Sequence, residues 1–292
     1  TIMSVATLNG INIFYEIVGN GPPVVFIHGG YGGADSTVMP RDDSWVPSLS
    51  ESNTIITYDR RSAGRSSYPN EIHSLDMLTT DLRELILHLD LNKPTIIGSS
   101  AGGPISLNYT LNFQDDVDKL ILVNTSSRLW KNNYRTKACI ELKSRHKTLN
   151  DLGPDKAFEI LRNEPSLLSL YLPPEGSGPI PKERKSIVAT RNQEIKQLTS
   201  SLTDNEKAIY AMGILRNQFA YADSDLSSRL NEITIPTLVI HGDSDNQVPY
   251  PLGKELSEQI PNSQLVTIPN AGHALMYWDK TIESITSFCN QD

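Results

Sequence analysis

Short apolar runs alternate with longer amphipathic stretches along most of this 292-residue chain. The short runs are rich in Val and Ile and are bounded by Gly, Pro or Asp, which is typical of strands buried on both faces of a sheet. Asn9-Gly10 separates the first two runs and predicts an antiparallel hairpin. We expect strands at residues 5–8, 11–18, 24–28, 54–58, 95–99, 119–124, 237–241 and 264–268.

The amphipathic stretches predict helices that cross between these strands. In the stretch 75–90, Leu and Ile recur at a spacing of three or four residues, which places them on one face of a helix. We expect further helices at residues 101–112, 251–259 and 276–289. Strands that alternate with helices indicate an α/β fold, here a mostly parallel eight-stranded sheet with flanking helices.

Residues 127–231 differ in character from the rest of the chain. They contain no run typical of a buried strand, but they show helical periodicity at 156–162 and 206–218. A Pro/Gly-rich stretch at 172–179 predicts a loop or hinge. We therefore expect an α/β core made of residues 1–126 and 232–292, with residues 127–231 inserted as a mostly helical cap, or lid.

Charge is unevenly divided between these two parts. Residues 127–231 hold 17 Lys and Arg against 12 Asp and Glu, although the whole chain has a net charge of −8. This balance argues against nucleic acid as a partner of the chain as a whole. The basic insertion either complements an acidic core on which it packs or attracts an anionic substrate.

Other features of the sequence indicate a cytoplasmic protein, and we expect it to be either a monomer or a homodimer. No apolar run approaches the ~18 residues that a membrane span needs. No basic segment followed by an apolar one marks a leader, although Thr1 before Met3 leaves a removed leader open. Cys139 and Cys289 fit no metal spacing, and we expect both to be reduced thiols.

The pentapeptide G-S-S-A-G at residues 98–102 lies between a predicted strand and a predicted helix. This G-x-S-x-G pattern holds a serine on a sharp turn with its hydroxyl exposed above a sheet. The flanking glycines leave room for the strained backbone of such a turn. The spacing selects Ser100 as the candidate nucleophile and places Ser99 at a tolerant position.

Candidate partners for Ser100 follow the last two predicted strands. Asp243 and Asp245 follow the first of these, and His273 follows the second. A serine needs a base to accept its proton, and a histidine base needs a carboxylate on its other ring nitrogen. We expect His273 to be the base and one of the two aspartates to orient it, while the other caps the turn.

The remaining histidines carry no comparable signal. His28 and His241 end apolar runs just before a glycine, and we expect them to hydrogen-bond loops. His73, His88 and His146 lie in polar surroundings and are expected to be exposed to solvent. None pairs at the spacing of a metal site, so we expect neither a metal nor a cofactor.

A glycine-rich loop, H-G-G-Y-G-G at residues 28–33, follows the third predicted strand. Such a loop can turn a backbone N–H toward the serine, as an oxyanion hole requires. We expect the N–H groups of Gly30 and Ala101 to be the two donors. A phosphate-binding loop would need a different glycine spacing, which does not occur here. We interpret the turn D-R-R-S-A-G-R-S at 59–66 as structural.

Five segments in order resemble motifs of the α/β-hydrolase superfamily. They are H-G-G at 28–30, the turn at 59–66, G-S-S-A-G-G at 98–103, G-D-S-D-N-Q-V-P at 242–249 and A-G-H at 271–273. The resemblance covers residues 4–126 and 232–290 and implies the chain order serine, acid, histidine. The family's pattern G-x-x-D-x-x-V-P falls on Asp245. This spacing favours Asp245 over Asp243. Other members take their acid from the end of the strand at 119–124, but Asn124 ends that strand here, which also supports Asp245.

The resemblance also implies a metal-free serine hydrolase that acts on a small-molecule carboxylic ester or lactone. The candidate substrate contacts are Tyr31, Trp130 and Met276, and further candidate pocket walls are Trp45, Tyr277 and Trp278. Three alternatives stay open: a C–C bond hydrolase of a ring-fission product, a prolyl aminopeptidase-like amidase, and a small-molecule receptor without turnover. Tyr31 stands where the aminopeptidases carry proline in H-G-G-P-G-G, which disfavours that activity.

Overall fold

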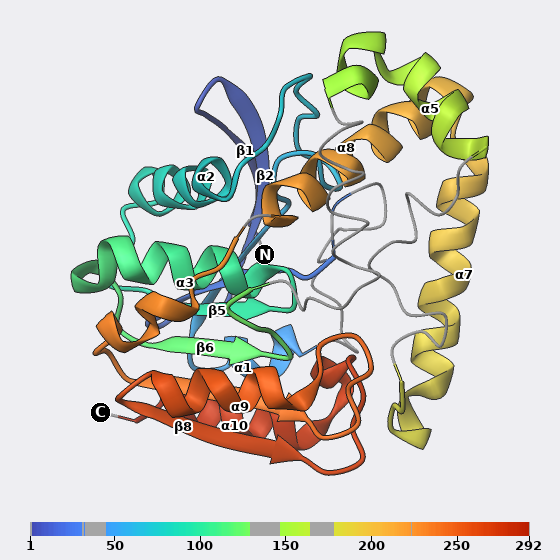
Figure 1. Cartoon of the computed structure of the whole chain (residues 1–292). Coiled ribbons are helices and arrows are strands. Elements are labelled where there is room, and N and C mark those ends of the chain that lie inside the picture. Colours follow the sequence, from blue (N-terminus) through green and yellow to red (C-terminus); the bar gives the residue numbers. More distant parts are fainter. Residues whose placement is uncertain are drawn as a thin grey trace.

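An eight-stranded sheet runs through the molecule in the strand order β1-β2-β4-β3-β5-β6-β7-β8 (Figure 1). The computed structural model describes residues 2–30, 32, 45–128, 147–163, 178–222 and 224–291. β2 pairs antiparallel with β1 and β4, and every other pairing is parallel, which confirms the predicted sheet. The strands are β1 (Ile2–Leu8), β2 (Ile11–Val18), β3 (Pro23–Ile27), β4 (Thr54–Tyr58), β5 (Thr95–Ser99), β6 (Leu120–Val123), β7 (Thr237–Gly242) and β8 (Ser263–Ile268).

Alternation of side chains along the strands divides the hydrophobic core into two layers. On β6, Leu120 and Leu122 belong to the first layer, whereas Ile121 and Val123 belong to the second. Because both faces of the sheet are covered, apolar residues stand at successive positions of the central strands. This burial explains why the strands are recognisable in the sequence as continuous apolar runs.

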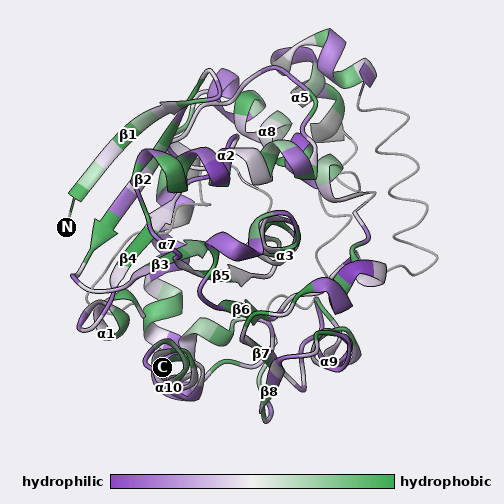
Figure 2. Cartoon of the chain, turned by 90° about the vertical axis from the view of Figure 1, so that its left-hand side faces the viewer, coloured by the Kyte–Doolittle hydropathy of each residue, from purple (hydrophilic) through white to green (hydrophobic). Residues whose placement is uncertain are grey.

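Helices cover both faces of the sheet (Figure 2). Residues of α2, α3 and α9 belong to the first core layer, and residues of α1 and α10 belong to the second. The helix expected at 276–289 is divided in two, because Trp278 is extended between η4 and α10. The bounds are α1 (Val46–Ser50), α2 (Leu75–His88), α3 (Gly102–Phe113), η1 (Gln114–Asp116), α9 (Tyr250–Gln259), η4 (Leu275–Tyr277) and α10 (Asp279–Cys289).

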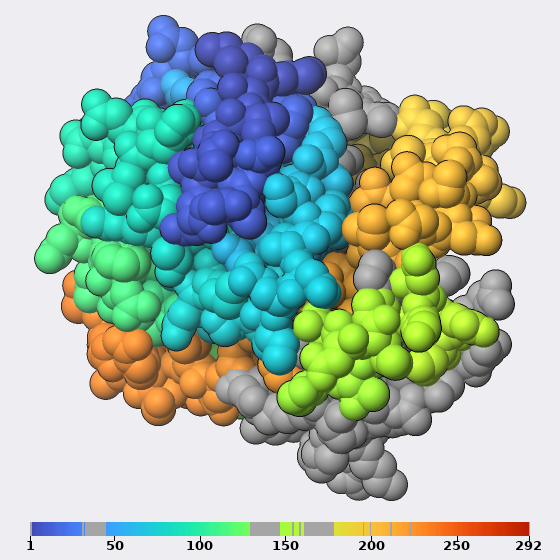
Figure 3. Space-filling view, turned by 90° about the horizontal axis from the view of Figure 1, so that it is seen from above, coloured from blue at the N-terminus to red at the C-terminus, as the bar shows by residue number. Residues whose placement is uncertain are grey.

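Between β6 and β7 most of the described residues are helical. Figure 3 shows α5 and α8 beside the segment 60–75. The end of α8 also contributes Ala220 and Tyr221 to the first core layer, so this helix is anchored in the α/β core. The loop predicted at 172–179 lies mostly outside the described residues. The bounds here are α5 (Pro154–Asn163), η2 (Lys182–Arg184), α7 (Lys185–Ser201), α8 (Asp204–Ala222) and η3 (Ser227–Glu232).

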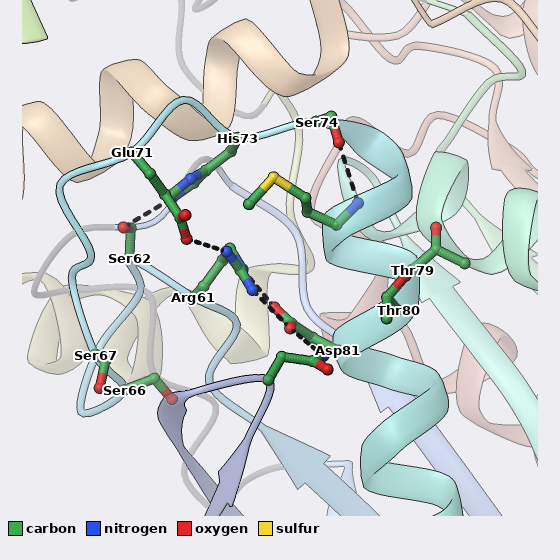
Figure 4. Close-up of polar contacts among 12 residues, drawn as sticks. Arg61, Ser62, Ser66, Ser67, Glu71, His73, Ser74, Thr79, Thr80 and Asp81 are labelled. Atoms are coloured by element: carbon green, nitrogen blue, oxygen red, sulfur yellow. Dashed lines mark hydrogen bonds and ion pairs between the residues drawn. The ribbon is translucent and has the colours of Figure 1, made fainter.

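A polar cluster follows β4 and includes a buried histidine (Figure 4). Arg61 forms ion pairs with Asp81 (2.5 Å) and Glu71 (2.6 Å). His73 Nε2 lies 2.9 Å from the hydroxyl of Ser62. The solvent exposure expected for His73 is therefore wrong, because the ring is fully buried and a distant hydroxyl takes the place of water.

The turn at 59–66 has the structural role expected of it. The Asp59 carboxylate accepts the backbone N–H of Arg65 (2.9 Å) and forms an ion pair with its guanidinium (2.7 Å). The Ser66 hydroxyl accepts from the backbone of β2 (2.9 Å), which ties the turn to the sheet. Of the two other histidines expected to be exposed, His88 is exposed and His146 lies outside the described residues.

Candidate active site

Ser100 occupies the turn between β5 and α3. Its φ of +49° lies in the left-handed region, which L-residues adopt at an energetic cost. Neighbouring segments hold the turn: the Ser100 N–H donates to the Val123 carbonyl (3.0 Å), and its own carbonyl accepts from the Thr125 hydroxyl (2.6 Å). This strained strand-to-helix turn at the carboxyl end of β5 is the one that the G-x-S-x-G spacing predicts.

Gly102 begins α3 directly after this turn and leaves no room for a side chain. A methyl group there would overlap the backbone carbonyl of Ile27 and would lie 3.0 Å from the carbonyl oxygen of His28. Both obstacles are backbone atoms of β3 and its loop, which cannot rotate away as a side chain can. The close approach of α3 to β3 therefore helps to position Ser100.

We expect Gly102→Ala to lower the free energy of unfolding by about 2–3 kcal/mol, because the added methyl overpacks the contact with β3. Helix propensity alone would favour the substitution by about 1 kcal/mol. Gly213→Ala in α8 is the comparison, since its methyl would meet side-chain atoms of Tyr68 (2.8 Å) and Ser62 (3.0 Å), and we expect a smaller loss of stability. Urea denaturation measures both variants. If Gly102→Ala had the same free energy of unfolding as the wild type, the inferred close packing of α3 against β3 would be contradicted.

His273 lies in the loop after β8, between Ser100 and Asp245. Its Nε2 is 2.8 Å from Ser100 Oγ, and its Nδ1 is 2.8 Å from Asp245 Oδ2. His273 and Asp245 are only 9% and 8% exposed, which limits competition from water. When Nδ1 donates to the carboxylate, Nε2 carries the lone pair that can accept the serine proton. The structure thus brings together three residues from distant loops.

Asp243 and Asp245 have different partners. Besides His273, the Asp245 carboxylate accepts two backbone N–H groups of its own loop, at 2.8 and 2.9 Å. Asp243 is exposed and accepts the backbone N–H of Asn270 (2.7 Å). Only Asp245 faces His273, and Asp243 caps the neighbouring turn.

Asn124, directly after β6, connects the serine turn to the histidine loop. Its side-chain amide donates to the His273 carbonyl (2.7 Å), and its Oδ1 accepts from the Ser99 hydroxyl (3.1 Å). These partners lie 149 and 25 residues away along the chain, so no local spacing could reveal them. The sequence signal was only a polar residue at the end of a buried strand.

The glycine-rich loop after β3 lies against the Ser100 turn. A methyl group on Gly29 would be 3.0 Å from Ser100 Cβ and 3.7 Å from its Oγ. Gly30 has a φ of +71°, which glycine adopts without strain. Ala101, the other expected N–H donor, immediately follows Ser100. Both expected donors thus belong to segments that adjoin the candidate nucleophile.

Comparison with known proteins places this chain in a family. A family model described as the alpha/beta hydrolase fold matches residues 22–280. The chain belongs to this family. The matched region runs from β3 into α10, so it contains the Ser100 turn and the loops that carry Asp245 and His273.

Relatives of this α/β hydrolase align over nearly its full length. The AB hydrolase superfamily protein YisY of Bacillus subtilis is 28% identical, over 98% of this chain and 97% of the relative. The bifunctional esterase/perhydrolase DCH of Acinetobacter calcoaceticus is 25% identical, over 93% of this chain and 92% of that protein. The solved enol-lactonase from Burkholderia xenovorans LB400 has a TM-score of 0.73 at 20% identity, covering 99% of this chain and 100% of the other. This last likeness shows a shared fold.

A second buried histidine, His241, lies beside Asp245 in this α/β hydrolase. Its Nε2 is 2.8 Å from the Val248 carbonyl and 3.5 Å from Asp245 Oδ2. Burial lowers the pKa of His241 below 6.5, although the Val248 carbonyl and the Asp245 charge oppose this shift. The folded protein therefore holds this imidazole neutral, with Nε2 donating to the carbonyl.

We expect the α/β hydrolase to lose stability as the pH falls below about 6.5. In that range the unfolded chain binds a proton at His241 and the folded chain does not, so acidification favours unfolding by up to about 1.4 kcal/mol per pH unit. Urea unfolding between about pH 7.5 and 5.5 measures this slope. His241→Gln keeps a donor for Val248 but cannot titrate, so its slope should be shallower. An unchanged slope would contradict this assignment.

The residues expected to line a substrate pocket are only partly described. Tyr31 and Trp130 lie outside the described residues. Met276, in η4, is half-buried and packs against the second core layer. Trp45 and Trp278 pack against the same layer, so both contribute to the core of the α/β hydrolase.

Among the described residues, no cluster of His, Cys, Asp and Glu side chains could hold a metal ion. His28 Nδ1 lies 2.7 Å from the Gly29 carbonyl, so His28 and His241 both hydrogen-bond loops as expected.

Within the residues that the structure describes, no helix has the length and apolar character needed to cross a bilayer. Cys289 is a free thiol, and burial raises its pKa to about 11.

Proposed function

We propose that this α/β hydrolase is a serine hydrolase that cleaves a carboxylic ester or lactone of a small molecule through an acyl-enzyme on Ser100. The observation that carries the proposal is the hydrogen-bonded chain from Ser100 Oγ through His273 to Asp245. A serine hydroxyl is a weak nucleophile until a base takes its proton. His273 is positioned to be that base, and the buried Asp245 holds it in the required tautomer.

In the proposed mechanism, Ser100 Oγ attacks the acyl carbon while His273 Nε2 takes its proton. The carbonyl electron pair moves onto oxygen, and the N–H groups of Gly30 and Ala101 stabilise the resulting oxyanion. Asp245 stabilises the imidazolium, which then protonates the leaving alcohol oxygen. Water, deprotonated by His273, attacks the acyl-enzyme, and His273 returns the proton to Ser100 Oγ as the bond to the acyl carbon breaks and the acid leaves. For a lactone, the alcohol and the acid belong to one product molecule.

Residues 127–231 are proposed to form a cap beside this site. The Gly272 N–H donates to the Pro179 carbonyl (3.1 Å), so the inserted segment contacts the loop that carries His273. A methyl group on Gly178 would lie 3.1 Å from the Gly272 Cα. A segment that reaches this loop is placed to limit the size of the acyl or alcohol group. Met276, in η4 three residues after His273, is a proposed substrate contact.

The printed names of relatives support an ester or lactone substrate. The Acinetobacter relative is named an esterase/perhydrolase, and the Burkholderia structure is named an enol-lactonase. Attack of a serine on an acyl carbon serves both kinds of bond. At these identities the names favour a class of bond and leave the compound open.

Fluorophosphonate labelling and burst kinetics with p-nitrophenyl acetate and butyrate test the proposal. We expect ester turnover and a single adduct by intact mass, which peptide mapping assigns to Ser100. A panel of lactones, a vinylogous diketone and a proline anilide then tests the type of bond. Faster cleavage of the diketone or the anilide than of any ester or lactone would replace the proposed reaction. Labelling without turnover of any compound would favour a receptor, and no labelling would contradict the serine mechanism.

A further inference from the structure

Arg60, two residues beyond β4, carries a buried positive charge next to the glycine-rich loop. Its side chain is only 1% exposed. Nη2 donates to the Gly30 carbonyl (2.6 Å) and the Gly29 carbonyl (3.3 Å). No carboxylate of a described residue lies within ion-pair distance of this guanidinium, whereas the adjacent Arg61 pairs with two. Desolvating a cation costs free energy, which the hydrogen bonds to the Gly29 and Gly30 carbonyls help to offset.

His28 connects Arg60 to the same loop. Its Nδ1–H donates to the Gly29 carbonyl (2.7 Å), and its Nε2 accepts from the backbone N–H and the Nε of Arg60, both at 3.4 Å. Burial and the nearby Arg60 charge lower the pKa of His28 well below 6.5, which keeps Nε2 free to accept. His28 and Arg60 therefore both donate to the Gly29 carbonyl.

These contacts determine the direction of the Gly29–Gly30 peptide. In a trans peptide the C=O and the N–H point in opposite directions. The Gly29 C=O faces Arg60 and His28, so the Gly30 N–H points away from them. Gly29 itself adjoins the candidate nucleophile, since a methyl there would lie 3.0 Å from Ser100 Cβ.

We propose that Arg60 is a positioning residue for the oxyanion hole, holding the Gly29–Gly30 peptide so that the Gly30 N–H is directed at the oxyanion formed on attack by Ser100. The inference rests on the function proposed above. The guanidinium also places a positive charge behind this peptide, where it favours a charged transition state over a neutral substrate. Arg60 therefore acts on kcat and not on KM.

Tyr221, at the end of α8, holds the guanidinium from the inserted segment. Its hydroxyl accepts a hydrogen bond from Arg60 Nη1, and both side chains are buried. The segment between β6 and β7 thus contributes to the position of the loop that carries Gly30. Tyr221→Phe removes this contact and leaves the Arg60 charge in place.

Two inhibitors separate binding of the transition state from binding of the ground state. A trifluoromethyl ketone analogue of a good ester substrate forms a tetrahedral oxyanion adduct on Ser100, whereas the matching N-methyl amide binds as a neutral ground-state analogue. We expect Arg60→Met to lower kcat and trifluoromethyl ketone affinity in parallel by about 10²-fold, with KM and amide affinity within about threefold. For Tyr221→Phe and Arg60→Lys, which retain the charge with fewer contacts, we expect parallel losses of about tenfold.

Arg216→Met is the matched control. Arg216 is also buried, but its Nε and Nη2 donate to Asn150 Oδ1 (3.1 and 2.9 Å) and not to the glycine-rich loop. We expect this variant to change thermal stability without changing the ratio of the two inhibitor affinities. If Arg60→Met does not fold, the kcat and inhibitor affinities of Arg60→Lys and Tyr221→Phe test the proposal instead.

Two results would overturn the inference alone. The first is an unchanged trifluoromethyl ketone affinity in the folded variants. The second is a change confined to KM in these variants. Both apply to variants whose Ser100 still reacts with fluorophosphonate. Failure of the wild type to react with fluorophosphonate would instead overturn the proposed function. The two failures are therefore distinguishable in one set of proteins.

Discussion

Ser100→Ala is expected to lower kcat for p-nitrophenyl butyrate by about 10⁶-fold, the scale on which loss of a nucleophilic serine acts in a Ser–His–Asp site. Without Oγ, the base 2.8 Å away has no hydroxyl to deprotonate, and no acyl-enzyme can form. Stabilisation of the oxyanion by backbone donors still leaves a residual rate about 10³–10⁴-fold above that in water. Progress curves over long incubations measure the rate, and intact mass measures the loss of the fluorophosphonate adduct.

Ser99→Ala is the control for this experiment. Ser99 is the adjacent serine, and its hydroxyl donates to Asn124 Oδ1 instead of contacting His273. We expect this variant to be labelled on Ser100. If Ser100→Ala kept more than about 1% of the wild-type kcat, a different nucleophile would have to be sought.

Asp245→Asn is expected to lower kcat by about 10⁴-fold without loss of the folded structure. The Asp245 carboxylate accepts a hydrogen bond from His273 Nδ1–H at 2.8 Å. An amide in its place can donate to Nδ1, which moves the ring proton to Nε2, where it faces Ser100 and prevents base catalysis. Steady-state kinetics with the same ester measure the loss, and thermal unfolding checks the fold.

Asp243→Asn is the matched control, because it makes the same chemical change two residues away. Asp243 is exposed and accepts the Asn270 N–H, which an asparagine oxygen can also accept. We expect a kcat close to that of the wild type. A loss as large as that of Asp245→Asn would show that the loop conformation, and not the contact with His273, is what the substitutions disturb.

The fold is largely predictable from local patterns. The runs expected at 54–58 and 95–99 coincide with β4 and β5, because their apolar residues are buried on both faces of the sheet. β1 begins at Ile2, earlier than the expected strand at 5–8, because its first residues pair with β2 as far as Ile17. That extension depends on a partner strand and has no signal in the residues themselves.

Local sequence patterns likewise predict only some residues of the candidate site. Ser100 is recognisable because a sharp strand-to-helix turn requires glycines at set positions around it. The expectation for His73 fails because its polar sequence neighbours suggest exposure, whereas Ser62 and the packed turn bury it. Asn124 shows the same limit, because its contacts with Ser99 and His273 join the end of β5 to the loops after β6 and β8.

The sequence by itself determined the α/β class, most of the strands and helices, and the residues from which a serine, an acid and a base could be chosen. Each of these follows from hydrophobic periodicity or from turn geometry within a few residues. Only the tertiary structure decided that Arg60 is a buried cation facing the Gly29 and Gly30 carbonyls, and that Tyr221 of a distant helix holds it. Burial and partners of a polar side chain depend on which remote segments pack around it, and that is a property of the folded chain.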